Sequence, residues 1–137
     1  MLTKELNLFK KPGNTIRIDA GDIDKQRTLF EGIILETGIK IGGKARSQMV
    51  VECRDFAYQA TQGRKNRIFE KKKDSDMIKE VLKAYGSVKV DATTCQYSEM
   101  VQYYCSDWDF ALSRADANGL FISTEGKEIE VFKKKVF

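Results

Sequence analysis

Residues 103–122 constrain the fold of this chain more than any other stretch, because they read as a strand end, a capped helix, a glycine stop and a new strand. Ser106 is a favourable N-cap residue, and Asp109 three positions later can reach back to the Ser106 backbone N–H. Gly119 predicts the end of a helix over about residues 107–118, because glycine adopts the left-handed backbone of a C-cap without strain. Helical spacing places four apolar residues on one face: Trp108, Ala111, Leu112 and Ala115. The rest of the chain must build a surface that covers this face.

A second amphipathic helix is predicted at about residues 75–85, capped by Asp74 or Ser75 and ended by Gly86. Five residues at helical spacing form its apolar stripe: Met77, Ile78, Val81, Leu82 and Tyr85. Charged residues fall on the opposite face, where they meet water. This pattern indicates a helix that packs on the core.

The first half of the chain is predicted to be β-rich. Strands are expected at residues 15–19 and 26–37, and a longer strand at residues 48–61, with Met49, Val51 and Cys53 facing inward. Gly32, in the middle of the second strand, predicts a bulge or a sharp bend. The glycine-rich residues 38–44 are expected to form the reversal of a hairpin. Such strands can curl into part of a barrel.

In the second half, short strands are predicted at residues 87–91 and 101–104, on either side of a polar linker. Residues 120–123 and 128–132 alternate well and are joined by a turn that contains glycine, which indicates a C-terminal hairpin. The predicted fold class is therefore α+β, mostly antiparallel, with a barrel-like, β-rich first half and two amphipathic helices. We expect one domain over residues 1–137 or an excised fragment of a longer chain, β-rich over 1–62 and helix-bearing over 63–137.

Histidine is absent from all 137 residues, and this absence argues against most catalytic chemistry. It removes Ser-His and Cys-His nucleophile pairs and the commonest general base. Three cysteines without a C-x-x-C spacing give neither a zinc cluster nor a disulfide framework. Asp107 and Asp109 invite a paired-carboxylate interpretation, but capping of the helix already explains both. The sequence therefore predicts no enzyme activity, no metal and no cofactor.

One concentration of basic residues, from Arg64 to Lys73, is the strongest candidate for a contact with a partner. Arg64, Lys65 and Arg67 could bind a nucleic acid, with Phe69 stacking on a base. An acidic surface of a protein partner fits the same charges, and so does a simple solvated loop. No membrane span or signal peptide is visible in the sequence, which predicts a chain made in the cytosol.

The opening segment resembles the "Y-x-E-S-D-x-x-F-x-x-R-x-x-E-x-x-G-I/L" motif of the VgrG spike proteins of type VI secretion systems. Seven residues match it: Tyr103, Ser106, Asp107, Phe110, Arg114, Gly119 and Leu120. Residues 30–34 resemble the "F-x-G-x-V" strand of the same family. Residues 67–69 and 75–82 resemble its "R-I-F-Q-x-x-S-x-x-D-I-V-x-x-V-L" segment. Two positions depart from the motif, where Cys105 replaces a charged residue and Ala117 an acidic one.

This resemblance covers about residues 15–125 and implies a structural role. The family is related to phage late-control gene D proteins and to the phage baseplate hub. Its members are homotrimers whose hub domains form a ring on a hexameric Hcp tube and meet other baseplate components. They assemble in the cytoplasm and are then exported, and their hubs carry no catalytic residues. A phage-tail hub and a small nucleic-acid-binding module remain as alternatives.

Overall fold

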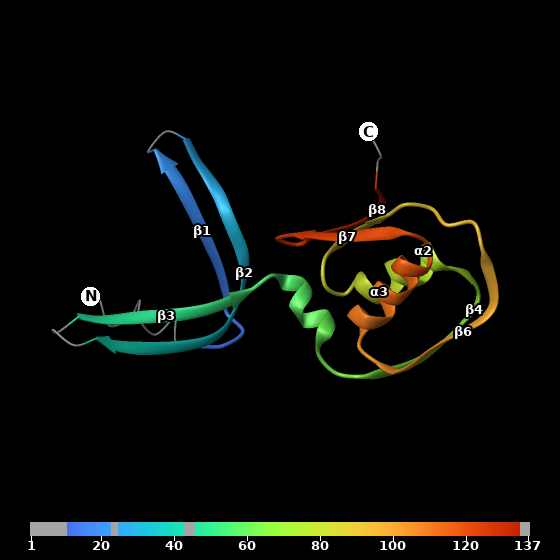
Figure 1. Ribbon diagram of the computed structural model, residues 1–137, viewed down its shortest axis with the longest axis horizontal. Coiled ribbons are helices and arrows are strands. Elements are labelled where there is room, and N and C mark those ends of the chain that lie inside the picture. The colour runs from blue at the N-terminus through green and yellow to red at the C-terminus, as the bar shows by residue number, and fades with distance from the viewer. Residues whose placement is uncertain (1–10, 23–24, 43–45, 135–137) are drawn as a thin grey trace. The chain divides into compact units, whose positions relative to one another are not determined.

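A computed structural model describes residues 11–22, 25–42 and 46–134 of the chain (Figure 1). The chain divides into two compact units, Met1–Phe56 and Ala57–Phe137, which are called unit 1 and unit 2 below. The described residues of unit 1 before Phe56 form strands and their connections, and both helices that the sequence predicts lie in unit 2. The division falls a few residues before the boundary expected between the β-rich and helix-bearing parts.

Unit 1 is an open antiparallel sheet of three strands: β1 (Thr15–Asp22), β2 (Lys25–Gly42) and β3 (Arg46–Arg54). The long strand β2 is shared, since its first half pairs with β1 and its second half with β3. Figure 1 shows β2 changing direction between these two hairpins. Gly32 lies at this change of direction, where a Cβ atom would come within 2.2 Å of the Arg54 carbonyl oxygen. Only glycine lets the two strands approach so closely.

Three sequence predictions about residues 38–61 are wrong. The expected reversal at residues 38–44 begins later, because β2 continues as a strand to Gly42; residues 43–45 lie outside the described part. The expected strand over 48–61 stops at Arg54, and Phe56–Thr61 forms a 3₁₀ helix, η1. Phe56, Ala57 and Ala60 are buried there, a spacing that suits a helix rather than a strand. Met49, predicted to face inward, is 44% exposed.

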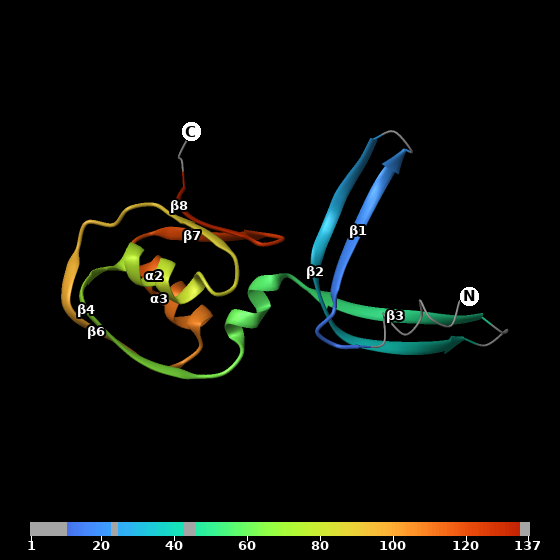
Figure 2. The same cartoon turned by 180° about the vertical axis from the view of Figure 1, so that it is seen from behind.

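Unit 2 combines a two-stranded ribbon, a three-stranded sheet and two helices. Its elements, in chain order, are β4 (Lys65–Lys73), α2 (Asp74–Leu82), β5 (Ser87–Val90), β6 (Gln96–Cys105), α3 (Asp107–Ala117), β7 (Leu120–Glu125) and β8 (Glu128–Lys133). Strands β4 and β6 form the ribbon, and the sheet has the order β5-β8-β7. The two helices lie between the ribbon and the sheet (Figures 1 and 2).

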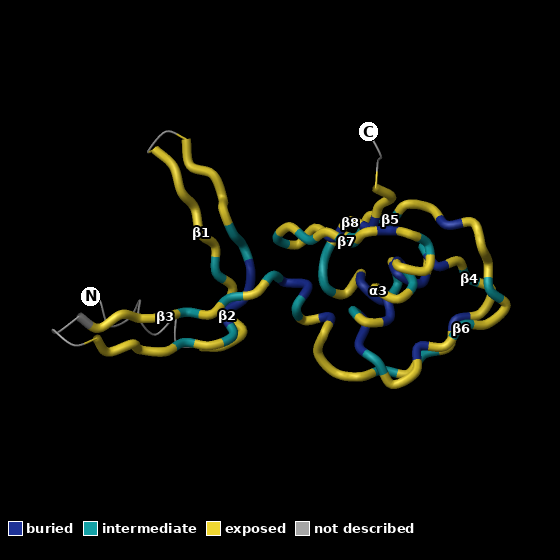
Figure 3. Tube along the Cα trace, in the orientation of Figure 1, coloured by how far each residue is buried: buried dark blue, intermediate teal, exposed yellow. Residues whose placement is uncertain are grey.

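The core of unit 2 forms where both helices meet the inner faces of the ribbon and the sheet. Eleven of its residues are Phe69, Met77, Ile78, Val81, Leu82, Phe110, Ala111, Ala115, Leu120, Ile129 and Val131. Figure 3 shows buried residues along the helices and at intervals along the strands of unit 2. The predicted stripe of α2 is confirmed for its four residues within the helix, although α2 ends at Leu82 and Tyr85 lies in the following turn.

The buried face of α3 differs from the prediction at two positions. Phe110 is buried and stacks on Phe69 of β4, with ring centroids 5.3 Å apart. This contact turns the helix so that Leu112 is 40% exposed, and Trp108 is only half-buried. Ala111 and Ala115 are buried as expected. The aromatic pair therefore sets the orientation of α3.

The α+β class with mostly antiparallel strands is confirmed, and so is the C-terminal hairpin. Among the described strands, one pair is parallel: β5 with β8, starting at Ser87 opposite Glu128. Strand β6 begins at Gln96, inside the stretch expected to be a linker. The described strands of unit 1 form an open sheet rather than a closed barrel. Among the described residues, no helix has the length and apolar character needed to cross a membrane.

Candidate protein-interaction face

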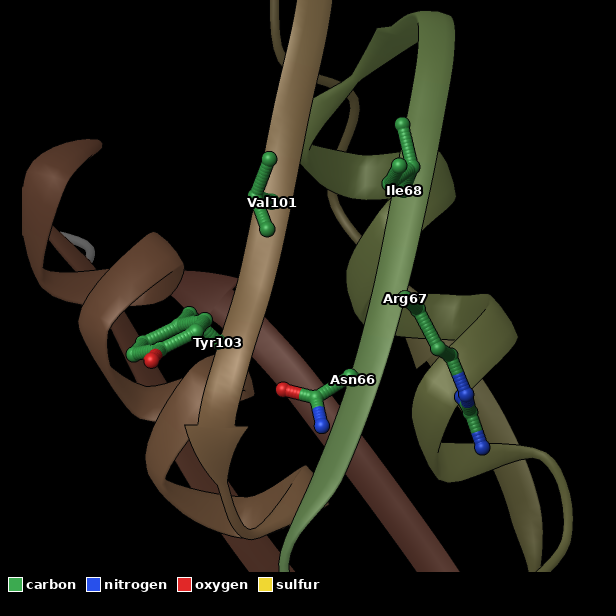
Figure 4. Close-up of a pocket in the computed structure, with 5 residues that line it drawn as sticks. All are labelled: Asn66, Arg67, Ile68, Val101 and Tyr103. Atoms are coloured by element: carbon green, nitrogen blue, oxygen red, sulfur yellow. The ribbon is translucent and has the colours of Figure 1, made fainter.

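The β4–β6 ribbon has two chemically different faces because neighbouring residues of a strand point to opposite sides. Phe69 lies opposite Met100 on the inner face, which meets the helices. Ile68 lies opposite Val101 on the outer face, where the two side chains are 65% and 46% exposed. An open pocket of about 500 Å³ lies here, lined by Asn66, Arg67, Ile68, Val101 and Tyr103 (Figure 4). The outer face therefore offers an apolar, hollowed surface.

A bulge widens this outer face at the end of the ribbon. Between the pairs Lys65–Cys105 and Arg67–Gln102 the register shifts, so that Asn66 faces both Tyr103 and Tyr104. Tyr104 has a φ of 46°, an uncommon conformation for a bulky residue. The Asn66 side-chain oxygen accepts a hydrogen bond from the Tyr104 backbone N–H at 2.8 Å and holds this conformation. Strained residues of this kind concentrate at functional sites.

The bulge exposes two consecutive tyrosines instead of one. Tyr103 is 81% exposed and Tyr104 is 60% exposed. The Arg64 guanidinium lies over the Tyr104 ring, 5.0 Å from its centroid, in a cation–π contact. Tyrosine and arginine are the residues that protein interfaces use most often as anchors. The composition of this end of the ribbon is therefore typical of a protein-binding surface.

The other end of the outer face is acidic. Glu70 and Glu99 lie directly opposite each other on the two strands, and both are exposed. Like charges at such positions destabilise a strand pair. Neither glutamate forms an ion pair with any residue in the described part of the chain. The outer face thus runs from an acidic end through an apolar centre to an aromatic and basic end.

On the inner face, cations and amides surround the buried carboxylate of Asp107. The Asp107 side chain is 1% exposed and lies at the start of α3. Its Oδ2 accepts hydrogen bonds from Lys65 Nζ at 2.6 Å and from the Tyr85 hydroxyl at 2.7 Å. Its Oδ1 accepts from Gln102 Nε2 at 2.9 Å, and Arg67 adds an ion pair at 3.6 Å. One carboxylate thus ties together β4, β6, α3 and the turn after α2.

The contacts of Asp107 explain how a carboxylate stays ionised in this place. Burial acts to raise the pKa of Asp107, but the hydrogen bonds from Lys65, Gln102 and Tyr85 and the charge of Arg67 outweigh it, so the pKa is lowered. The hydrogen bond to Asp107 raises the pKa of Lys65 in turn. The pair is therefore charged at neutral pH, and its contacts serve the fold.

A second buried carboxylate lies at the start of the other helix. Asp74 is 0% exposed, and the predicted cap role is absent, because Lys73 is the N-cap and no side chain caps α2. The Asp74 carboxylate instead accepts a hydrogen bond from Asn118 Nδ2 at 2.8 Å and forms an ion pair with Arg114 Nε at 3.2 Å. Each helix therefore has its first aspartate bound by residues at or beyond the end of the other helix.

The structure places the residues of the motif in five different roles. Ser106 is the N-cap of α3, as predicted, since its hydroxyl accepts from the Asp109 backbone N–H at 3.0 Å. Asp109 accepts from the Ser106 hydroxyl rather than from the Ser106 backbone N–H. The other motif residues are Asp107 and Arg114 in the two carboxylate networks, Phe110 and Leu120 in the core, Gly119 with φ 64° after the helix, and Tyr103 on the outer face.

The three basic residues proposed as a partner contact separate in the structure. Lys65 and Arg67 point inward to Asp107, and only Arg64 lies on the outer face beside Tyr104. Sequence reasoning missed Gln102 and Tyr85, which complete the Asp107 network. The alternation of β6 gave one usable signal, because Gln102 occupies an inward position two residues after Met100. Within the described residues, no group of acidic or cysteine side chains is arranged to hold a metal ion.

The fold is similar to that of a solved structure, "the tail protein from Neisseria meningitidis MC58". The match has a TM-score of 0.60 at 14% sequence identity and covers 90% of this chain. The chain corresponds to 43% of the length of that tail protein. At this level of identity the likeness shows the fold alone.

Comparison with curated proteins finds no match. Comparison with protein families finds one that spans nearly the whole chain, although it is not the VgrG family that the motifs resemble. This family is described as the Alg8 N-terminal domain, and it matches residues 5–136. The protein therefore belongs to the Alg8 N-terminal domain family.

Proposed function

We propose that this chain is a structural part of a tail-like injection machine, and that it works by making contacts between subunits rather than by catalysis. The observation that carries this proposal is the similarity to a tail protein over 90% of the chain. The three ordered motifs that resemble VgrG proteins support the same class of machine.

More specifically, the chain is the hub part of a spike protein that trimerises in its complete form and sits on an Hcp-like tube beside baseplate proteins. The machine assembles in the cytoplasm and carries the spike out of the cell. The motif centred on Ser106, Asp107 and Phe110 supports the spike assignment. A hub of a phage tail is the nearest alternative, and it uses the same contacts.

The exposed surfaces also support a role as a subunit of an assembly. In unit 1, Leu29, Ile39 and Ile41 are 69%, 72% and 82% exposed. In unit 2, Ile68 and Tyr103 are exposed to a similar degree. Exposed apolar groups on this scale are typical of interaction surfaces, because a water-facing apolar side chain gains free energy when a partner covers it.

The position of the basic residues favours a protein assembly over a nucleic-acid module. Lys65 and Arg67 form ion pairs with Asp107, and Lys72 forms an ion pair with Glu80. A nucleic-acid site needs cations that are free to replace the counterions of phosphates. Arg64 remains on the outer face, where it stacks on Tyr104.

The test is the mass of the complete gene product in solution and its binding to the tube protein encoded with it. We expect a trimer that binds the end of a tube ring in light scattering and in electron micrographs. A monomeric complete protein would contradict the hub assignment. A complete protein that instead binds DNA or RNA, with a steep salt dependence lost on neutralising Arg64, Lys65 and Arg67, would favour the nucleic-acid alternative.

A further inference from the structure

Unit 2 carries two exposed strips whose chemistry is complementary position by position. The first, called the ribbon strip, consists of Arg64, Asn66, Ile68 and Glu70 with their cross-strand neighbours Tyr103, Tyr104, Val101 and Glu99. The second, called the sheet strip, consists of Glu128, Glu130, Phe132 and Lys134 with their neighbours on β7, which are Glu125, Ser123 and Phe121; on the other side of β8, Ser87 and Lys89 of β5 lie opposite Glu128 and Glu130. Both strips lie on strand faces that point away from the core.

The two strips have the same spacing. In each, the leading members are every second residue, so those within the strand follow one another at about 6.8 Å along one face; Arg64 lies one residue before β4 and Lys134 one residue after β8. The ribbon strip reads basic, amide, apolar, acidic from Arg64 to Glu70, and the sheet strip reads acidic, acidic, aromatic, basic from Glu128 to Lys134. Arg64 thus corresponds to Glu128, Ile68 to Phe132, and Glu70 to Lys134.

We propose that the occupant of the ribbon strip is a second copy of this chain, which contacts it through the sheet strip with β4 and β8 running in the same direction. Arg64 then faces the acidic pair Glu125 and Glu128, and Lys134 faces the acidic pair Glu70 and Glu99. In the centre, Ile68 and Val101 pack on the Phe121–Phe132 pair, whose ring centroids lie 6.4 Å apart. Phe121 and Phe132 are 52% and 39% exposed before this contact forms.

Electrostatics on both strips favour this pairing. Glu125 and Glu128 lie directly opposite each other, as Glu70 and Glu99 do. No ion pair neutralises any of these four carboxylates within the described residues, and the same holds for Arg64 and Lys134. The contact brings each repelling pair against an unpaired cation, which relieves the like-charge repulsion on both sides.

The hydrogen-bonding groups between the charged and apolar positions also match. The Asn66 amide uses its oxygen to accept from Tyr104, which leaves its NH₂ group as a donor on the strip. The corresponding residue on the sheet strip is Glu130, whose carboxylate is exposed and holds Lys89 at 3.2 Å. A carboxylate has lone pairs for both donors.

The symmetry of the contact follows from the position of the strips on different sides of the helix pair (Figure 2). A contact between two unlike surfaces is head-to-tail, so each copy has one strip left to bind the next copy. Such contacts close into rings or continue as filaments. The inference rests on the proposed hub function, for which it supplies the surfaces that join neighbouring copies in a ring.

One ribbon strip against one sheet strip makes a small contact, so a single contact is weak. Interfaces under about 1,200 Å² belong to transient complexes. In a closed ring every copy is held at both strips, which raises the stability of the whole far above that of one contact. We therefore expect the 137-residue chain to associate reversibly at high concentration and in low salt.

The first experiment blocks one strip at a time. The ribbon variant is Ile68→Ser with Val101→Ser, and the sheet variant is Phe121→Ser with Phe132→Ser, all at exposed positions and all without a change of charge. Each variant alone should be monomeric in sedimentation velocity at about 1 mM. An equimolar mixture should form a dimer and nothing larger, because only one pair of intact strips remains. The wild-type chain should form larger species under the same conditions.

The second experiment exchanges charges across the contact. Arg64→Glu and Glu128→Arg should each weaken association about tenfold, and the double variant should recover most of the loss. Lys40→Glu, an exposed change on β2 of unit 1, serves as the control and should leave association unchanged.

Three results would overturn the inference. These are a wild-type chain that stays monomeric at about 1 mM in low salt, a mixture of the two blocked variants that fails to dimerise, and a double charge variant without recovery. The hub assignment is tested separately in the complete protein. If that protein trimerises even when both strips are blocked, the strips are wrong and the hub assignment stands. If the unmodified complete protein is monomeric, the hub assignment itself fails.

Discussion

The two units of this protein differ in how far they bury their apolar side chains. Unit 2 encloses its apolar residues between a ribbon, a sheet and two helices, and Met77, Ile78 and Leu82 are completely buried there. Unit 1 is an open sheet, and among its described residues the buried apolar side chains are those of Ile33 and Ile34 at the bend of β2 and of Phe56 at its end. We therefore expect unit 2 to be stable by itself and the hairpins of unit 1 to depend on a surface that covers them.

The largest expected effect concerns separation of the units. A fragment of residues 57–137 should keep its fold and unfold cooperatively on heating, because its core lies within it. A fragment of residues 1–56 should show no cooperative transition, because two-stranded hairpins are marginal in water. Circular dichroism and the dispersion of amide signals in NMR spectra distinguish the outcomes. A well-dispersed spectrum of the 1–56 fragment would show that unit 1 folds by itself and would contradict this difference between the units.

A matched pair of truncations tests the same contrast inside the intact chain. Phe69→Ala should lower the free energy of unfolding by about 3–5 kcal/mol, because the ring is 2% exposed and stacks on Phe110. Ile41→Ala should change it by less than about 0.5 kcal/mol, because that side chain is 82% exposed. Urea unfolding of both variants gives the two values. Equal losses would mean that Ile41 packs against something in solution.

The Asp107 network should give an intermediate effect. Asp107→Ala should cost about 2–3 kcal/mol, less than the loss of about 3–5 kcal/mol for a fully buried pair, because Lys65 and Arg67 are about one third exposed and can turn to water. Asp116→Ala, at an exposed position on the same helix, is the control and should cost little.

The same network predicts a pH dependence. The pKa of Asp107 is lowered in the folded state, so its contribution is complete above the unfolded value of about 3.9 and is lost as pH falls through the folded value. The pKa of Lys65 is raised in the folded state. Its contribution is therefore complete below the ordinary lysine pKa of about 10.4 and is lost as pH rises through the raised folded value. Asp107→Asn should therefore flatten the acid limb of the stability curve. An unchanged acid limb would show that Asp107 is not ionised in the fold.

The smallest expected change in stability concerns alanine substitutions at two glycines. Gly119→Ala should cost about 1 kcal/mol, because φ is 64° after α3 and alanine is strained there. Gly38→Ala in β2 should be neutral or stabilise by about 0.4–1 kcal/mol, since its φ is not in the left-handed range and a new Cβ atom would meet no atom within 4 Å. Thermal unfolding of both variants measures the difference, and a loss at Gly38 would indicate a partner close to that strand.

Local signals in the sequence were sufficient to predict the elements whose own residues mark their ends or their alternation. Ser106 and Gly119 mark the ends of α3, and the alternation of residues 120–132 predicts the terminal hairpin. The 3₁₀ helix at Phe56–Thr61 was missed because Met49, Val51 and Cys53 alternate just before it. The strand predicted from this alternation was extended past its true end at Arg54. The outward turn of Leu112 was also beyond local reasoning, because it depends on Phe69, a residue of another element.

The candidate site could be predicted only in part for a similar reason. The sequence named Arg64 as a possible partner contact and Tyr103 as a residue of the family motif, but the separation of Arg64 from Lys65 and Arg67 onto opposite faces depends on a ribbon that pairs residues far apart in sequence. Lys65 and Asp107 are 42 positions apart. A basic cluster in sequence is therefore not a basic patch in space when a buried carboxylate from a distant helix draws two of its members inward.

The two aspartates at the starts of α2 and α3 have a mechanical consequence. Asp74 is bound by Arg114 and Asn118, and Asp107 is bound by the Tyr85 hydroxyl, so each helix is fastened to the other at both of its ends. Sliding one helix along the other shears both fastenings together, rather than breaking them one after the other as peeling would. A thrust applied to the ribbon therefore reaches the sheet on the far side of the helix pair with little loss to internal slippage.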